Sequence, residues 1–271
     1  SLHRSMIINQ KDKEFDEAVI TSDLVLGESK TPFSLPRGAK IGTCLHEILE
    51  EVDFINSNQE IFNQKVSQKL IKYKIDSSWC ETITKMLLDL MRVPLINKTS
   101  LNQISLSQRI IELEFYFPFS KIDRSKLNQK LLSVAKKDVQ KDLVQLFSLM
   151  DLSRLNGYMR GFIDMIFKFE NKYYIIDWKS NYLGDQLSDY TAEKLKVYML
   201  EHTYHLQYYI YLLALHKYLK YRISDYDFSR HLGGVYYTFL RGIGENHQTG
   251  IYVDTLSDTK AFIERLDSLF Y

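Results

Sequence analysis

The sequence predicts an α/β fold with a central mixed sheet flanked by helices. Residues 158–169 and 172–179 form two runs rich in Ile, Phe, Tyr and Met, separated by only two residues. Runs of this composition with partial period-two alternation are typical of strands, and the short gap indicates a hairpin. Segments with apolar residues at helical spacing precede and follow the hairpin, so helices are expected on both sides of it in the chain.

The same periodicities predict the other elements. The expected helices are 41–56 with Thr43 as N-cap, two within 58–92, amphipathic helical sequence in 123–150, and then 192–200, 202–220 and 257–271. The expected strands outside the hairpin are 109–117 and 233–240. Residues 1–40 are polar and irregular and contain two Pro and two Gly, so we expect a linker there and one domain over 41–271.

Composition narrows the class of protein. The chain has 271 residues, of which 45% are hydrophobic and 25% charged, as is typical of soluble globular proteins. No run of about 20 apolar residues and no secretory signal is visible, so we expect a cytoplasmic protein without a membrane span. The net charge of +1 gives no support for nucleic-acid binding, although a neutral chain can carry a locally positive groove.

Two absences in the sequence exclude particular chemistries. The only cysteines, Cys44 and Cys80, form no C-x-x-C pair, which favours free thiols in a reducing compartment. An iron–sulfur cluster requires about four cysteine ligands, so none is predicted. The phosphate-binding motif G-x-x-x-x-G-K-[ST] does not occur, so this chain itself is expected to have no ATP-driven motor.

Charged residues interrupt the apolar hairpin at three positions, Asp164, Asp177 and Lys179. If the turn is centred on residues 170–171, Asp164 lies directly opposite Asp177, with Cβ atoms about 4.5–5.5 Å apart. Two carboxylates at that separation repel each other unless a proton or a cation intervenes. Lys179 shares a strand face with Asp177 and supplies one positive charge, and a divalent metal would supply the rest.

A structural explanation competes with this hypothesis. Asp177 and Lys179 alone fit a plain surface ion pair better than a functional site. Asp164 is harder to explain in that way, because it lies between Ile163 and Met165 in a half-buried strand, where a carboxylate is usually paired or metal-bound. Together the three residues favour a site.

The order of motifs also resembles a known family. GFIDMIF followed by YYIIDWKSNYLG resembles the RecB-like nucleases of the PD-(D/E)xK superfamily, which form the C-terminal domain of the beta subunit of exonuclease V, the RecBCD helicase-nuclease. The similarity extends from GTCLHEILE upstream to HTYHLQYYIYLLALHKYL and GGVYYTFLRG downstream. It implies a restriction-endonuclease-like α/β core and a metal-dependent exodeoxyribonuclease that acts in DNA repair and recombination.

The resemblance assigns roles to residues of this chain. It implies that Asp164, Asp177 and Lys179 are catalytic, and that a metal is bound by His46, both aspartates and the backbone carbonyl of Trp178. Gln207 and Tyr211 form the Q-x-x-x-Y motif that supports the site and the substrate strand. The family also has an acidic residue on the strand 109–117, and either Glu112 or Glu114 fits that position. Arg241 either contacts phosphate or lies at a sheet edge.

Cofactors and partners follow from the same resemblance. It implies Mg²⁺, which Mn²⁺ can replace because one ligand is an imidazole. It also implies single-stranded DNA as substrate, double-stranded DNA through a complex with RecC-like and RecD-like subunits, a link to RecA, and ATP dependence only through a helicase portion. Two alternatives remain: a stand-alone exonuclease of phage or CRISPR type, and a catalytically silent DNA-binding or interaction module.

Overall fold

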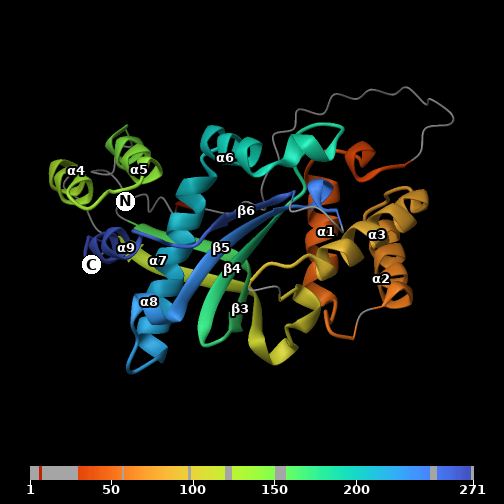
Figure 1. Cartoon of the computed structure of the whole chain (residues 1–271), viewed down its shortest axis with the longest axis horizontal. Coiled ribbons are helices and arrows are strands. Elements are labelled where there is room, and N and C mark those ends of the chain that lie inside the picture. The colour runs from red at the N-terminus through yellow and green to blue at the C-terminus, as the bar shows by residue number, and fades with distance from the viewer. Residues whose placement is uncertain are drawn as a thin grey trace.

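The structure is a computed structural model of the chain. It describes residues 6–7, 30–56, 58–96, 99–119, 124–149, 157–244 and 249–269. A mixed sheet of six strands runs through the middle of this described part, and helices gather at both ends and across one face (Figure 1). The predicted α/β class with a central mixed sheet is therefore confirmed.

Strand β3 (Gly157–Phe169) organises the sheet, because three other strands pair with it. Strand β2 (Arg109–Phe119) runs antiparallel along almost its whole length, β4 (Lys172–Lys179) runs antiparallel to its second half, and β1 (Met6–Ile7) pairs parallel with its first half. Beyond β4 the order continues with the parallel strand β5 (Leu232–Phe239) and the antiparallel strand β6 (Ile251–Asp254). The hairpin thus occupies the middle of the sheet.

The helices divide into groups that cover the sheet (Figure 1). One group, at the end opposite the C-terminus, consists of α1 (Ala39–Glu51), α2 (Gln59–Lys72) and α3 (Cys80–Arg92). The long helix α7 (Tyr204–Arg222) crosses the sheet. The others are α4 (Arg124–Leu132), α5 (Asp138–Leu149), α6 (Ala192–Glu201), α8 (Phe228–His231) and α9 (Lys260–Asp267).

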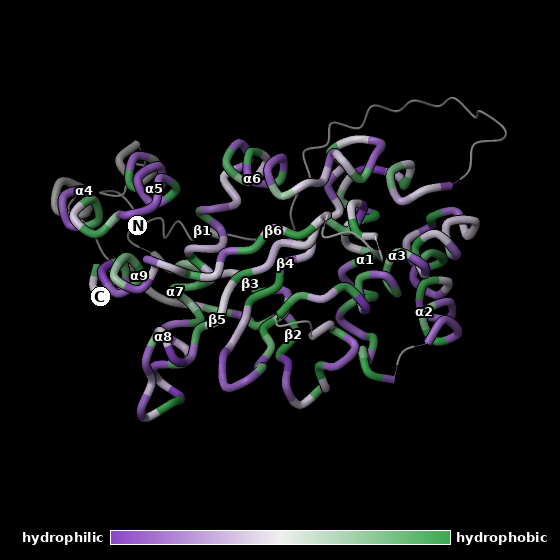
Figure 2. The backbone as a smooth tube through the Cα atoms, in the orientation of Figure 1, coloured by the Kyte–Doolittle hydropathy of each residue, from purple (hydrophilic) through white to green (hydrophobic). Residues whose placement is uncertain are grey.

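The sheet is buried on both faces, which is why its strands are so apolar. Alternate residues of the hairpin enter two different cores: Ile166 and Ile175 pack with α7 and α9, whereas Met165 and Ile176 pack with α1 and α3. Hydrophobic residues accordingly follow the central strands, while the outer side of α2 is hydrophilic (Figure 2). A charged residue on either face of the hairpin therefore lies in an apolar layer.

Several boundaries differ from the sequence-based expectation. The first helix begins at Ala39, with Gly38 as N-cap, so the assignment of Thr43 as N-cap was wrong. The Thr43 hydroxyl instead donates to the Ala39 carbonyl one turn earlier, as hydroxyl side chains inside helices do. Strands β1 and β6 were not predicted, since two and four residues are too few to show a period.

The division into a linker over 1–40 and a domain over 41–271 stays a prediction. Of the first 40 residues the structure describes 6–7 and 30–40. Residues 6–7 pair with β3, and the 3-10 helix η1 (Pro32–Ser34) lies against α3 and against a second 3-10 helix, η7 (Leu240–Gly242). Parts of this stretch therefore contact the domain.

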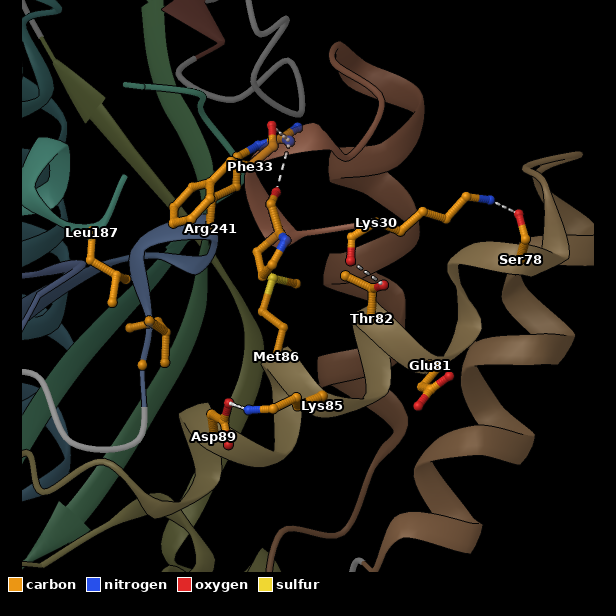
Figure 3. Close-up of a pocket in the computed structure, with 13 residues that line it drawn as sticks. Lys30, Phe33, Ser78, Glu81, Thr82, Lys85, Met86, Asp89, Leu187 and Arg241 are labelled. Atoms are coloured by element: carbon orange, nitrogen blue, oxygen red, sulfur yellow. Dashed lines mark hydrogen bonds and ion pairs between the residues drawn. The ribbon is translucent and has the colours of Figure 1, made fainter. Parts of the chain in front are cut away.

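Arg241 holds the segment around η1 in place. Its side chain is 1% exposed and donates hydrogen bonds to backbone carbonyls, at 2.6 Å to Ser180, 2.8 Å to Leu35 and 2.8 Å to Pro36, and at longer range to Pro32 and Phe33. It borders a cleft of about 760 Å³ between α3 and η7 (Figure 3). The structure favours the structural role over the phosphate contact for Arg241, because its donors bind backbone carbonyl groups of the protein itself.

The first prediction concerns this arginine. Arg241→Met removes the donors of five backbone carbonyl groups, two in buried and three in part-buried hydrogen bonds, so we expect a loss of about 3–5 kcal/mol in the free energy of unfolding, measured by urea denaturation. Glu81→Gln is the matched control, because Glu81 borders the same cleft and is exposed. We expect it to change stability by less than about 0.5 kcal/mol. Equal effects of the two variants would contradict an anchoring role for Arg241.

Candidate active site

The hairpin turn determines which carboxylates face each other. Glu170 and Asn171 both have positive φ angles, 45° and 63°, as a two-residue type I′ turn requires. The strands then pair from Phe169 with Lys172 up to Met165 with Ile176, so the next opposed positions are Asp164 and Asp177. The predicted register is confirmed, and both aspartates are buried, at 6% and 2% exposure.

Asp164 connects the hairpin to helix α1. Its Oδ2 accepts a hydrogen bond from the Trp178 amide at 2.9 Å, and its Oδ1 lies 3.6 Å from Nδ1 of His46. Nε2 of His46 lies 2.9 Å from the Trp178 carbonyl oxygen. Helix α1 buries Leu45 and Ile48 against the sheet, and this packing brings the half-buried His46 to the strand ends.

Asp177 forms a buried ion pair with Lys179. Lys179 Nζ lies 2.9 Å from Asp177 Oδ2, and the two side chains are 1% and 2% exposed. The residues are two apart on β4 and therefore share a face, as the sequence indicated. Lys179 Nζ also donates to Oε1 of Gln207 at 3.3 Å. The ammonium group is thus held between a carboxylate and an amide oxygen.

Gln207 and Tyr211 extend the network along α7. They are four residues apart, and Nε2 of Gln207 donates to the Tyr211 hydroxyl at 2.9 Å. Oε1 of Gln207 also accepts from the hydroxyl of Tyr237 on β5 at 2.9 Å. Tyr237 was missed by the sequence analysis, because a tyrosine in an apolar strand carries no local signal of a polar contact.

The structure distinguishes the two candidate glutamates on β2. Ile111 pairs with Met165 and Leu113 pairs with Ile163, so Glu112 lies at the position opposite Asp164. Glu112 has a φ of 51°, an irregularity that bulky residues rarely adopt within a strand. Glu114 is exposed and forms an ion pair with Arg160 at 2.6 Å. Glu112 therefore occupies the strand position opposite Asp164, and Glu114 does not.

The neighbouring histidines and cysteines do not form a second ligand set. His205 is 5% exposed and lies 3.1 Å from the Tyr252 hydroxyl, and burial lowers its pKa to about 4, so it is neutral at pH 7. His202 stacks on Tyr198. Burial raises the pKa of Cys44 to about 11, which keeps that thiol protonated. These contacts give the two histidines structural roles.

The carboxylate of Glu47, the residue after His46, forms ion pairs with two lysines of α2. Hydrogen bonds from Lys72 and Tyr73, together with the nearby Lys69, lower the pKa of Glu47 to about 2. Glu51 joins the cluster through Lys69 and Lys65. Lys65, Lys69 and Lys72 of α2 thus pair with acidic residues of α1.

The donors gathered at the hairpin are two carboxylates, an imidazole and a backbone carbonyl. Oxygen donors of this kind suit Mg²⁺, and the imidazole suits Mn²⁺ better. Among the described residues, no group of three or more His, Cys, Asp or Glu side chains that could hold a metal ion is present. The types of donor at the hairpin nevertheless fit a divalent ion. In the structure the two carboxylates contact Lys179 and the Trp178 amide.

All seven residues singled out from the sequence lie in this one region. His46, Asp164 and Trp178 form one set of contacts, and Asp177, Lys179, Gln207 and Tyr211 form a second. The two sets meet where Asp164 and Asp177 face each other across the hairpin. Segments more than 150 residues apart in the chain thus meet at one strand end.

Among the described helices, none is long and apolar enough to cross a membrane.

Comparisons with known proteins agree with this geometry. The model of the PD-(D/E)XK nuclease superfamily matches residues 22–269. The chain is 36% identical to RecBCD enzyme subunit RecB of Escherichia coli over 258 residues, which are 94% of this chain and 21% of that protein. The corresponding subunit of Haemophilus influenzae is 34% identical over 266 residues, 96% of this chain and 21% of that protein. The chain therefore spans about a fifth of the length of these curated relatives.

A more distant relative has a similar extent of match. RecBCD enzyme subunit RecB of Mycolicibacterium smegmatis is 26% identical over 275 residues, which are 90% of this chain and 25% of that protein. The similarity thus covers nearly the whole chain in each case. It corresponds to the nuclease-domain region of RecB, as the motif order indicated.

The second prediction tests the buried ion pair. Lys179→Met leaves Asp177 buried beside Asp164 without its ammonium partner, so we expect a loss of about 3–5 kcal/mol in unfolding free energy in metal-free buffer. The double variant Asp177→Asn/Lys179→Met removes both charges, and we expect it to regain most of that loss. Urea denaturation of the two single variants and the double variant gives the coupling directly. Additive effects would contradict a direct interaction between the two side chains.

Proposed function

The chain belongs to the PD-(D/E)XK nuclease superfamily, and we propose that it hydrolyses DNA phosphodiester bonds with the help of a divalent metal, Mg²⁺ or in its place Mn²⁺. The single observation that carries this proposal is the contact network at the end of the hairpin. Two buried carboxylates face each other there, a buried lysine pairs with one of them, and a histidine contacts the other. A purely structural ion pair does not require the second carboxylate or the histidine.

Four residues would hold the metal: His46, Asp164, Asp177 and the carbonyl of Trp178. When bound, a divalent ion supplies charge neutralisation at the phosphate and makes a coordinated water more acidic. Asp164 and Asp177 contribute the negative charge that attracts the cation. His46 is already oriented toward the same place by its contact with the Trp178 carbonyl at 2.9 Å.

Lys179 would act on the water and the phosphate. Its Nζ is held beside Asp177 and Gln207, and from that position the ammonium group would orient a water or stabilise negative charge on the phosphate. Gln207 and Tyr211 would support this arrangement, because the amide that accepts from Lys179 is itself held by two tyrosine hydroxyls. A group that acts in this way is expected to contribute about 10²–10⁴ in rate.

The role in a larger enzyme is a proposal from the relatives. Their names describe a subunit of the RecBCD enzyme, and this chain covers only about a fifth of their length. We propose that it is the nuclease part of a RecBCD-type helicase-nuclease in double-strand break repair and recombination, acting in the cytoplasm as an exodeoxyribonuclease of the exonuclease V type. A helicase portion would supply ATP dependence and deliver the DNA strands, RecC-like and RecD-like subunits would complete the complex, and RecA would act on the product.

The third prediction is the direct test of nuclease activity. The purified chain is expected to cleave end-labelled single-stranded DNA in Mg²⁺ and to lose cleavage in EDTA. Asp177→Asn removes one charge of the carboxylate pair with little change in shape, so we expect a loss of about 10²-fold or more in rate. Gel analysis of the labelled products provides the measurement.

The outcomes of this cleavage assay distinguish the proposed nuclease from the alternative functions. If the chain is inert, calorimetry with Mn²⁺ decides between the remaining possibilities. Metal binding without cleavage indicates a domain that depends on partner subunits, whereas no metal binding overturns the catalytic proposal and favours the silent module. Processive cleavage from ends by the isolated chain on long DNA would instead favour a stand-alone exonuclease.

The fourth prediction compares the two glutamates of β2. Glu112→Gln alters the acidic residue opposite Asp164, so we expect weaker Mn²⁺ binding and slower cleavage, each by about tenfold. Glu114→Gln is the matched control, because it removes only an exposed ion pair with Arg160. We expect it to change neither quantity by more than about twofold. The opposite ranking would show that the second glutamate is the one near the metal.

A further inference from the structure

The environment of the Lys179 ammonium group contains more than its two polar partners. Lys179 is 1% exposed, and its Nζ lies 4.3 Å from the ring centroid of Tyr204 and 5.5 Å from that of Tyr237. The group is thus enclosed by Asp177, Gln207 and two aromatic rings. Among the described residues, no other lysine Nζ lies over two aromatic rings in this way.

An aromatic face stabilises a nearby cation through its electrostatics. The ring carries negative charge on its face, and the attraction is stronger when the cation is removed from water, as it is here. Lysine needs such support more than arginine does, because its ammonium is a compact charge on a flexible four-carbon stem. Nζ of Lys179 contacts the polar groups of Asp177 and Gln207, and the ring of Tyr204 gives it a third contact.

The fold holds the Tyr204 ring from several sides. Tyr204 is the first residue of α7, and side chains there tilt toward the helix N-terminus, which directs the ring away from the body of the helix. Its hydroxyl donates to Oδ1 of Asn181 at 3.3 Å, and Asn181 is two residues after Lys179. Its ring centroid lies 6.0 Å from that of Tyr237. Tyr204 therefore contacts the end of β4 at both its ring and its hydroxyl.

The residue before Tyr204 has an unusual backbone conformation. Thr203 has φ 56° and ψ 22°, a left-handed conformation that is costly for a β-branched residue. This conformation allows the chain to turn from α6 into α7 with only two residues between them. Strained residues of this kind persist where the surrounding structure determines the backbone, and Thr203 directly precedes Tyr204.

We infer that Tyr204 is a positioning residue for Lys179, and that its ring face, rather than its hydroxyl, holds the ammonium group in the orientation needed for phosphodiester hydrolysis. This inference rests on the proposed nuclease function for its catalytic consequence. The contact itself is a property of the fold and can be measured without catalysis.

The activity test varies the ring electrostatics at nearly constant shape. Phenylalanine and its mono-, di- and trifluorinated analogues are placed at position 204, and kcat and KM are measured for single-stranded DNA with Mg²⁺. Tyr204→Phe is expected to stay within about twofold of the natural protein. Each added fluorine weakens the ring face, so kcat is expected to fall stepwise by about tenfold in total while KM changes little. Tyr204→Leu, which lacks the ring, is expected to lose about 30-fold in kcat.

The matched control is Tyr173, which makes a similar contact far from the aspartate pair. Lys168 Nζ lies 5.7 Å from its ring centroid, near the turn of the same hairpin. The same fluorinated series at position 173 is expected to leave kcat unchanged. A flat kcat series at position 204, or equal slopes at both positions, would overturn the role of the Tyr204 ring face.

An activity-independent measurement separates this inference from the proposed function. In protein labelled with ¹³C at the lysine ε-carbon, the Lys179 signal, assigned by its absence in Lys179→Arg, is expected to be shifted upfield by the ring current. The shift should persist in Tyr204→Phe and become much smaller in Tyr204→Leu, which keeps only the more distant ring of Tyr237. If the chain neither cleaves DNA nor binds Mn²⁺ but shows this pattern, the nuclease proposal fails while the contact stands. An unshifted signal would overturn the contact itself.

Discussion

The buried ion pair between Asp177 and Lys179, opposite Asp164, is the interaction on which the rest of the structure depends. Two carboxylates and an ammonium group in an apolar layer are costly, and they are tolerated only when each is paired and hydrogen-bonded. Every element around the hairpin contributes to that pairing. Helix α1 supplies His46, α7 supplies Gln207, and the backbone amide of Trp178 donates to Asp164.

The two cores explain how such a charged group is kept in place. One face of the sheet packs against α7 and α9 and the other against α1 and α3, so the hairpin cannot shift toward either side without disrupting a packed layer. A slip of one residue would also move both aspartates to the opposite face. Arg241 adds a further constraint directly after Lys179, because it binds the Ser180 carbonyl and the backbone around η1.

The nearly neutral charge of the chain agrees with the proposal that it forms part of a larger enzyme. With 35 basic and 34 acidic residues the chain has no overall attraction for DNA, and many of its lysines pair with carboxylates, as Lys69 and Lys72 do with Glu47. The relatives that it matches are about five times longer. Guidance of the nucleic acid strand by other parts of such a protein would reconcile a neutral surface with a site built for phosphodiester chemistry.

The sequence by itself determined the local structure: the α/β class, the hairpin, the register that opposes Asp164 and Asp177, and the pairing of Gln207 with Tyr211. These follow from periods of two and 3.6 residues and from the length of the turn, which are local properties of the chain. Only the tertiary structure decided that His46 contacts Trp178 across 132 positions and that Tyr204 and Tyr237 lie around Lys179. It also decided that Glu112 rather than Glu114 occupies the strand position opposite Asp164. These contacts depend on how α1, β2, α7 and β5 pack on the hairpin, and packing between distant segments leaves no periodic signal in the sequence.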